Sequence, residues 1–398
     1  MAKTYAYISR WSEFVGEPGL AICEYDPDTG EMKEPQILDS SLQFNHMVIN
    51  REKNVLYINN EVGSNPDYFK GGGGLIYAYQ IDPESGNLTQ ISRVAACCPC
   101  PSYLSIDPTG KFLICANHSG YNAVTKAVQN EDGSWGMQML YDDATVDLFE
   151  LNEDGSIGAL VDVSKHTGLN PKFLLHAHPH SAVWSPSGNF FVTCDKGEDN
   201  IRLYRIDYKD MKLETIGEPY KDQPFSAPRY CVFHPNQPYL FVNHEQNTII
   251  TSFRYTEEGE LTEVCKANVL PDSVKLPDMK GKGFKSFKPG EKPAQQAIVI
   301  SEDGRYIYDV INGKDIDGIS VLEVNPDDGS LKLIQYLKTD GVWARGIALA
   351  PGGKTLVVTC MDREGAVLSY KIANDGTLSP TGSKLELPGA AFAAFYCA

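Results

Sequence analysis

The sequence predicts an all-β fold, a seven-bladed β-propeller of four-stranded antiparallel blades, from two repeated turn units and their regular alternation. Strand periodicity dominates the chain, and no stretch combines helical apolar spacing with convincing caps. The length of 398 residues could also suit two or three ordinary domains. Because seven repeats account for the whole length, we expect residues 1–398 to form a single domain.

The first repeated unit is an apolar or aromatic strand, an acidic turn ending in Gly, and another apolar residue. Its clear copies are YDPDTGEM from Tyr25, YQIDPESGNL from Tyr79, FELNEDGSI from Phe149, FRYTEEGEL from Phe253, LEVNPDDGSL from Leu322 and YKIANDGTL from Tyr370. A seventh copy, YRIDYKDMKL from Tyr204, lacks the Gly. Each copy predicts two strands joined by a tight turn, since Gly readily adopts the positive φ that such turns need.

The second unit is a short apolar strand, a turn that usually contains Pro or Gly, and a strand of β-branched and aromatic residues. Six copies are clear, among them SAVWSPSGNFFVTCD from Ser181 and YCVFHPNQPYLFVNHE from Tyr230. The seventh blade is therefore expected to be composite, with a strand near Thr4–Ser9 pairing with the C-terminal run AAFAAFY. Such closure removes exposed sheet edges. A pair of β-sandwiches is the alternative, but it does not explain why the two turn types alternate.

Two stretches are longer than the repeat requires, and we expect them to be insertions. One covers about residues 120–147 and is expected to form a long loop or a hairpin extension. The other covers about residues 270–296 and includes a Lys-rich segment near 275–292. Long loops on a propeller face often border a ligand site. The sequence leaves open whether the Lys-rich segment does so or is a solvated insertion.

The composition limits the partners of the protein. With 52 acidic and 35 basic residues, the formal net charge of -17 argues against a nucleic-acid or anionic-membrane surface. A small anionic substrate remains compatible, because it needs only a few local cations. The first residues lack the apolar core of a signal peptide, and no stretch is long enough to span a membrane. We therefore expect a cytoplasmic protein that is a monomer or a weak homo-oligomer.

The cysteines indicate buried, reduced thiols and no cofactor. Most of the ten lie singly in β-like runs, as Cys115, Cys194, Cys231 and Cys360 do. The one cluster, at residues 97–100, lacks a second ligand pair at metal-binding spacing. The run HAHPH from His176 would place three His on one side only if it were extended. No metal is expected.

Polar residues flank the strands of the second unit. Because each such pair of strands forms a hairpin, the residues before its first strand and after its second lie at one end of the blade. In a propeller these ends meet on one face, around the channel, and the convergence predicts a ligand site there. The candidates are Glu61, His118, His178, His180, Asp195, Arg229, Glu245, Asn312 and Arg345.

These residue types indicate hydrolysis or proton transfer on a small anionic carbonyl compound. Neutral His and ionised Glu can act as general bases, and Arg can bind a carboxylate, a phosphate or a developing oxyanion. No G-x-S-x-G motif occurs, and nothing marks a Ser or Cys as an activated nucleophile.

Two segments resemble a known family. HAHPHSAVWSPSGNFFVTCDKGEDNIRLYRID from His176 and APRYCVFHPNQPYLFVNHE from Ala227 look like blades of the lactonase-type seven-bladed propellers, which include bacterial 6-phosphogluconolactonases and fungal carboxy-cis,cis-muconate cyclases. The resemblance extends over essentially the whole chain. It implies catalytic roles for His180, Arg229 and Glu245. A second family Arg is missing, because Asn312 stands there; Lys314 or Arg345 could replace its charge.

The expected activity is hydrolysis of a sugar lactone without a metal, most simply 6-phosphogluconolactone, a step of the pentose phosphate pathway in carbohydrate metabolism. Glu245 or His180 would activate water, and Arg229 would hold the lactone carbonyl or the anionic group. The substrate would also contact His178, Asp195, Asn312, Arg345, Glu61 and His118. Two alternatives stay open: a carboxy-cis,cis-muconate lactonising cycloisomerase and a non-enzymatic binding scaffold.

Overall fold

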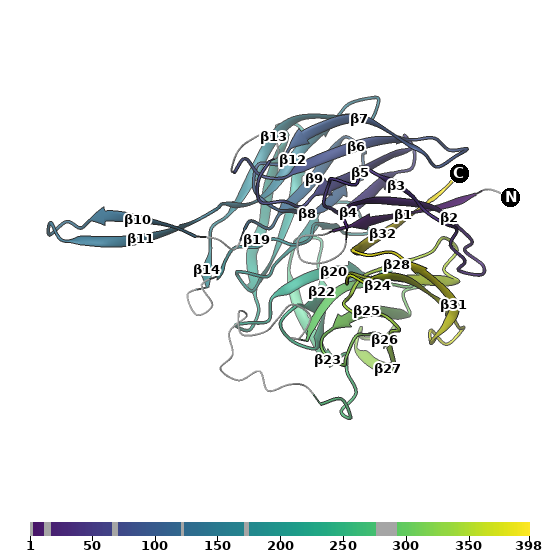
Figure 1. Ribbon diagram of the computed structural model, residues 1–398. Coiled ribbons are helices and arrows are strands. Elements are labelled where there is room, and N and C mark those ends of the chain that lie inside the picture. Colours follow the sequence, from purple (N-terminus) through teal and green to yellow (C-terminus); the bar gives the residue numbers. More distant parts are fainter. Residues whose placement is uncertain (1–2, 12–16, 66–70, 121–122, 171–174, 276–292) are drawn as a thin grey trace.

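Seven four-stranded antiparallel sheets surround a central channel in the computed structural model, which confirms the predicted β-propeller (Figure 1). The structure describes residues 3–11, 17–65, 71–120, 123–170, 175–275 and 293–398. Within these ranges every regular element is a strand, so the described chain offers no helix that could cross a membrane.

Blades 1 to 3 follow the channel in sequence order, each starting with its innermost strand. Blade 1 consists of β4 (Phe44–Asn50), β5 (Val55–Asn60), β6 (Leu75–Ile81) and β7 (Leu88–Ala95). Blade 2 consists of β8 (Pro101–Ile106), β9 (Phe112–Asn117), β12 (Ala144–Leu151) and β13 (Ile157–His166). Blade 3 consists of β16 (Val183–Trp184), β17 (Phe191–Asp195), β18 (Asn200–Asp207) and β19 (Lys212–Lys221).

Blades 4 to 6 repeat this order. Blade 4 consists of β20 (Pro228–Phe233), β21 (Tyr239–His244), β22 (Ile249–Tyr255) and β23 (Leu261–Asn268). Blade 5 consists of β24 (Ala294–Ile300), β25 (Tyr306–Asn312), β26 (Gly318–Val324) and β27 (Leu331–Lys338). Blade 6 consists of β28 (Ala344–Leu349), β29 (Thr355–Cys360), β30 (Ala366–Ile372) and β31 (Leu378–Glu386).

Blade 7 closes the ring with strands from both ends of the chain, as predicted. It contains β32 (Ala390–Cys397), β1 (Thr4–Arg10), β2 (Gly19–Tyr25) and β3 (Gln36–Leu38). Tyr5 of β1 lies opposite Tyr396 of β32 on one side and Glu24 of β2 on the other. The described ends of the chain consequently lie close together, and the backbone N–H of Ala398 donates to the carbonyl of Lys3 at 2.9 Å (Figure 1). This pairing removes the open edges that a chain ending in separate blades would leave.

The glycine of the first repeated turn also joins neighbouring blades. Gly86 has a φ of 72°, and a Cβ added there would lie 2.4 Å from the ring of Tyr5 in blade 7. The hydroxyl of Tyr7 donates a hydrogen bond to the Gly86 carbonyl at 2.8 Å. In the copy that lacks Gly, Met211 takes its place with a φ of 52°. The repeat therefore persists in the backbone where the sequence has lost it.

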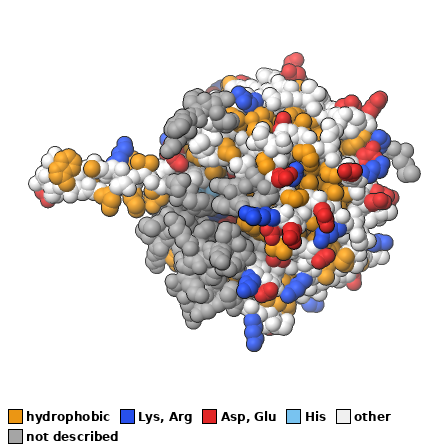
Figure 2. All heavy atoms as spheres, viewed as in Figure 1, with side chains coloured by type: hydrophobic (Ala, Val, Ile, Leu, Met, Phe, Trp, Pro, Cys, Tyr) orange, Lys and Arg blue, Asp and Glu red, His pale blue; other side chains and the backbone are white. Residues whose placement is uncertain are grey.

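The first insertion is a hairpin arm, formed by β10 (Ala123–Gln129) and β11 (Trp135–Tyr141), that projects from the body (Figure 1). The expected range of 120–147 was too long, because residues from Ala144 onward belong to β12 of blade 2. Apolar side chains are exposed along the arm, among them Trp135 at 73% and Met137 at 72% (Figure 2). Register places both on one face of the hairpin.

The second insertion lies mostly outside the described residues, which stop at residue 275 and resume at residue 293. The Lys-rich segment near 275–292 is thus almost entirely outside them. The expected range of 270–296 was again too long, because Ala294 already begins β24. A short pair, β14 (Leu169–Asn170) and β15 (Leu175–His176), precedes blade 3.

The cysteines agree with the prediction of buried, unpaired thiols. All ten are free, and the four single cysteines named above are buried. Burial raises the pKa of the Cys360 thiol to about 12, so it stays protonated at neutral pH.

Candidate active site

Functional side chains gather at one end of the channel because each inner hairpin starts and ends there. In blade 4, Pro228 on β20 pairs with His244 on β21, which brings Arg229 next to Glu245. In blade 3, Pro179 forms an isolated bridge with Asp195, which brings the segment before β16 beside the end of β17. We call this end the channel mouth; it comprises Glu61, His118, His178, His180, Lys196, Arg229, Glu245 and Arg345.

A buried ion cluster centres on Glu245. Its Oε2 accepts hydrogen bonds from Nε of Arg229 at 3.0 Å and from Nζ of Lys196 at 2.9 Å. A second nitrogen of Arg229, Nη1, donates to the carbonyl of Gln296 in blade 5. The guanidinium also lies over the ring of Tyr230, with Cζ 4.6 Å from its centroid. Arg229 is only 1% exposed, so these contacts fix its orientation.

The two buried glutamates of the mouth have pKa values shifted in opposite directions. Burial alone would raise the pKa of Glu245, but the charges of Lys196 and Arg229 outweigh it and lower the pKa to about 2. For Glu61 burial dominates and raises the pKa above its ordinary value, against the charge of Arg345 and a hydrogen bond from Asn45. Two carboxylates with separated pKa values can take different roles in proton transfer.

Arg345 enters the mouth from blade 6. Its Nη1 donates to the side-chain oxygen of Gln296 at 2.7 Å, and its guanidinium carbon lies 5.7 Å from the ring centroid of Trp11. Burial lowers its pKa, and the charge of Arg229 lowers it further. Two guanidinium groups near one another favour binding of an anion between them.

Three histidines form the wall beside this cluster. The ring of His118 lies 4.8 Å from that of His178 and 5.3 Å from that of His180, measured between centroids. His118 donates through Nδ1 to the carbonyl of Ser119 at 2.6 Å, and His178 donates through Nδ1 to the carbonyl of His118. Burial lowers the pKa of all three, to about 3 for His178, so each is neutral at pH 7.

His180 differs from the other two, because its Nδ1 is buried and has no hydrogen-bond partner among the described residues. Its backbone nitrogen donates to the carbonyl of Cys194 at 2.8 Å, which fixes the segment beside β17. Nε2 is therefore the ring nitrogen left to meet a ligand.

Two predicted substrate-binding residues have side chains already engaged inside the protein. Asp195 accepts backbone hydrogen bonds through Oδ1 from His178, Gly197 and Glu198, at 2.7, 3.0 and 2.9 Å. Its Oδ2 accepts from His166 at 2.7 Å. Asn312 is 2% exposed and donates to the carbonyl of Ala344 at 3.3 Å. Asp195 thus holds the segment that carries His178 and His180 in place. Asn312 links blade 5 to blade 6.

The structure adds Lys196 and Gln296 to the residues that sequence reasoning selected. Lys196 comes directly after β17, which ends at Asp195. The other candidates were chosen because they flank strands of the second repeated unit, and the same criterion would have selected Lys196. Gln296 lies near the start of β24, and its link between Arg229 and Arg345 depends on three blades and is not visible in the sequence. Of the candidates for the missing family Arg, Lys314 is exposed, whereas Arg345 reaches the mouth.

Among the described residues, one group could offer three metal ligands: His166, Asp195 and Glu198, whose ligand atoms lie within 4.8 Å of one another. Both nitrogens of His166 are already bonded, to Asp195 at 2.7 Å and to the hydroxyl of Tyr204 at 2.9 Å. Glu198 accepts from the backbone of Gly168 and from Arg202. These bonds satisfy the group as it stands, so it does not fit a metal site.

Fold and mouth together define a class of protein: a β-propeller whose channel mouth carries carboxylates, neutral histidines and guanidinium groups. The comparisons agree with this class. The chain belongs to the seven-bladed β-propeller lactonase family, whose model matches residues 6–395.

Curated relatives and solved structures match along nearly the whole chain. A 6-phosphogluconolactonase of Bacillus subtilis is 27% identical over 391 residues, covering 98% of this chain and 97% of the relative. One of Formosa agariphila is 23% identical, covering 93% of each. A periplasmic gluconolactonase of Pseudomonas aeruginosa superposes with a TM-score of 0.80 at 21% identity, covering 99% of both chains. That structural likeness supports the fold.

Proposed function

We propose that the protein hydrolyses a sugar lactone, with 6-phosphogluconolactone as its substrate. The observation that carries the proposal is the channel mouth, where the fixed guanidinium of Arg229, the guanidinium of Arg345 and the Glu61 carboxylate of raised pKa converge. The names of the curated relatives support the same reaction. Sugar lactones open readily without an enzyme, so side chains alone can supply the transition-state stabilisation required.

Glu61 is the proposed general base. An effective base at neutral pH needs a pKa that is not far below 7. Glu245, with a pKa of about 2, holds its proton too weakly, and burial lowers the pKa of His180 well below its usual value. Burial raises the pKa of Glu61, so its carboxylate is more basic than that of Glu245. The proposal therefore gives Glu61 the role that the sequence analysis gave to Glu245 or His180.

The reaction balances with these groups. Glu61 takes a proton from water as the water oxygen bonds to the lactone carbonyl carbon. The carbonyl oxygen gains negative charge, which Arg229 stabilises through Nη2, a nitrogen that makes no hydrogen bond to the described residues. The bond between the carbonyl carbon and the ring oxygen then breaks, and the ring oxygen receives the proton from Glu61. The product is the open hydroxy acid.

Glu245 and Arg345 have supporting roles. Glu245 holds both Arg229 and Lys196, and so fixes the guanidinium at the carbonyl oxygen. Arg345 binds the phosphate, because its partner Gln296 is uncharged and leaves its positive charge available. It thereby supplies the charge that Asn312 lacks.

The proposal is tested by measuring the opening of 6-phosphogluconolactone and gluconolactone with purified protein, above the spontaneous rate. We expect faster opening of the phosphorylated lactone and loss of most activity in Arg229→Ala. Arg254→Ala is the matched control, because Arg254 is an exposed arginine on β22. A carboxylated muconate assayed in parallel examines the alternative reaction. Turnover of the muconate alone, or of no substrate, would contradict the proposal.

A further inference from the structure

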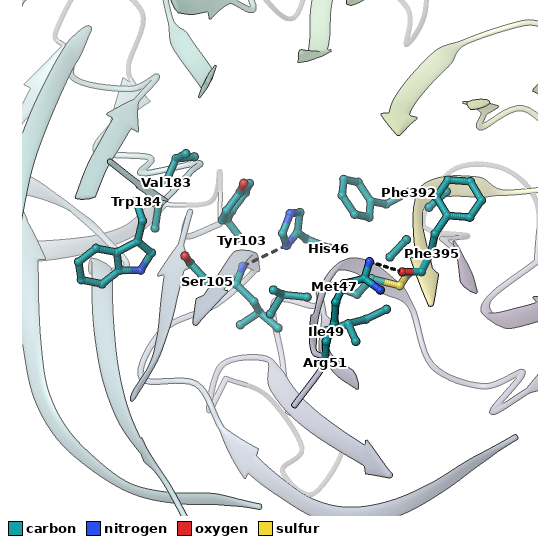
Figure 3. Close-up of a pocket in the computed structure, with 15 residues that line it drawn as sticks. His46, Met47, Ile49, Arg51, Tyr103, Ser105, Val183, Trp184, Phe392 and Phe395 are labelled. Carbon is teal, nitrogen blue, oxygen red and sulfur yellow. Dashed lines mark hydrogen bonds between the residues drawn. The ribbon is translucent and has the colours of Figure 1, made fainter. Parts of the chain in front are cut away.

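A cavity lies along the channel, and the residues of the ion cluster at the mouth do not line it. Its volume is about 390 Å³. It is lined by residues 46–49, 51, 103–105, 182–184 and 392–395, and we call it the channel cavity. These residues come from the innermost strands of blades 1, 2, 3 and 7 and from short segments next to them (Figure 3). The volume lies within the range of small-molecule pockets.

Apolar and aromatic side chains form most of the cavity wall. Met47, Ile49, Val183, Trp184 and Phe392 all line it. All but Met47 are only partly buried, so the structure leaves apolar surface uncovered there. Burying that surface against a ligand would be favourable. The occupant should therefore have an apolar body.

His46 is a fixed hydrogen-bond donor at this wall. The backbone N–H of Leu104 donates to Nδ1 of His46 at 3.1 Å, so the ring proton of the neutral form is on Nε2. The ring is 5% exposed, and Nε2 makes no hydrogen bond to the described residues. It is held between Tyr103, at 3.8 Å between centroids, and Phe392, at 4.5 Å. Burial lowers the pKa of His46 to about 3, which keeps the ring neutral.

A positive charge completes the polar part of the wall. Figure 3 shows Trp184 at the cavity wall; its Nε1 is buried and closed to a ligand, so the indole contributes packing surface and the positive charge comes from Arg51. Arg51 is exposed and donates through Nη2 to the carbonyl of Phe395 at 2.9 Å. Among the described residues, no Asp or Glu lines the cavity. The described wall thus offers the His46 donor and a cation without an opposing carboxylate.

We propose that the channel cavity is a binding site for a small aromatic carboxylate. Its ring packs against the apolar wall beside Phe392 and Trp184, and its carboxylate pairs with Arg51 where the cavity meets solvent. Such a ligand complements a cavity whose described lining residues include Arg51 and no acidic side chain. The site is separate from the proposed catalytic residues, none of which lines the cavity.

Fluorine NMR titration of the full chain with 4-fluorobenzoate tests the proposal. We expect saturable binding, at least about tenfold tighter than that of neutral 4-fluorobenzamide, because the amide cannot pair with Arg51. Ala394→Phe, which fills the cavity, should abolish binding. Arg51→Gln should remove the preference for the carboxylate, whereas the exposed control Arg254→Gln should leave it unchanged.

Two results would overturn the proposal. One is the absence of saturable binding to the unmodified protein. The other is binding that survives both Ala394→Phe and Arg51→Gln and disappears in Arg345→Gln, since the carboxylate would then occupy the channel mouth. Thermal unfolding of each variant shows whether it is folded; Arg51 is exposed, so Arg51→Gln keeps the test decisive if Ala394→Phe does not fold.

Discussion

The channel mouth and the channel cavity are built by the same inner strands, yet their chemistry is opposite. The mouth holds buried carboxylates, guanidinium groups and histidines, whereas the described lining residues of the cavity are mostly apolar or aromatic and include no carboxylate. The difference follows from position along the strand. Residues within an inner strand must pack against the next blade, so apolar side chains are required there. Residues at strand ends are free of that constraint and can carry polar functional groups.

Among the substitutions that test this contrast, replacing Glu61, the proposed general base at the channel mouth, should reduce the activity most. Glu61→Gln keeps the size of the side chain but cannot accept a proton, so we expect kcat/KM to fall by about 10² to 10⁴. The pH profile gives a second readout. Glu61 must be ionised to act, so activity should fall as the pH drops through its raised pKa, above the ordinary value of 4.5. A profile flat down to pH 4, or an active Glu61→Gln, would exclude this role.

Removing the fixed guanidinium should have the next largest effect. Arg229→Ala is expected to lower kcat by about 100-fold or more, because an oxyanion donor is lost. The substitution also removes one of the two cations that hydrogen-bond to Glu245 and leaves Lys196 as the other. The free energy of unfolding should therefore fall by about 3 kcal/mol. Chemical denaturation separates the two effects. A folded variant with full activity would show that the mouth does not stabilise the carbonyl oxygen.

Arg345 should affect the preference for the phosphorylated substrate more than it affects kcat. Arg345→Gln is expected to raise KM for 6-phosphogluconolactone about tenfold while KM for gluconolactone changes little, because only the former loses a charge contact. Lys314→Gln is the matched control, since Lys314 is the other nearby candidate for the missing Arg and is exposed. The reverse pattern would assign phosphate binding to Lys314.

The smallest effect on lactone turnover is expected from a substitution in the channel cavity. Ala394→Phe fills the channel cavity without touching the proposed catalytic residues, so kcat/KM for the lactone should stay within about twofold of the unmodified protein. Steady-state kinetics on the folded variant provides the check. A large loss of lactone turnover would show that the substrate uses both ends of the channel.

The sequence could predict the blades because their turns are local. An Asp or Asn turn ending in Gly specifies a hairpin within ten residues, and even the copy with Met211 keeps the same backbone. Arg229 and Glu245 were predictable for the same reason, since hairpin register brings them together. Hairpin register does not indicate whether a side chain at a strand end faces a ligand or accepts hydrogen bonds from the backbone of the adjacent turn. Asp195 does the latter.

Features that depend on several blades could not be predicted. The bridge through Gln296 joins residues from blades 4, 5 and 6, and the channel cavity joins strands that are far apart in the chain. The pKa values of the glutamates depend on burial and on charges from other blades. This is why the sequence suggested Glu245 or His180 as the base, whereas the pKa shifts of the two glutamates lead us to propose Glu61.

The central claim is that the channel mouth opens a sugar lactone with Glu61 as the base. It is tested most directly by following 6-phosphogluconolactone opening with the unmodified protein, Glu61→Gln and the exposed control Arg254→Gln, above the spontaneous rate. We expect full activity in the first and last and almost none in Glu61→Gln. Equal rates in all three, or no rate above the spontaneous one, would contradict the claim.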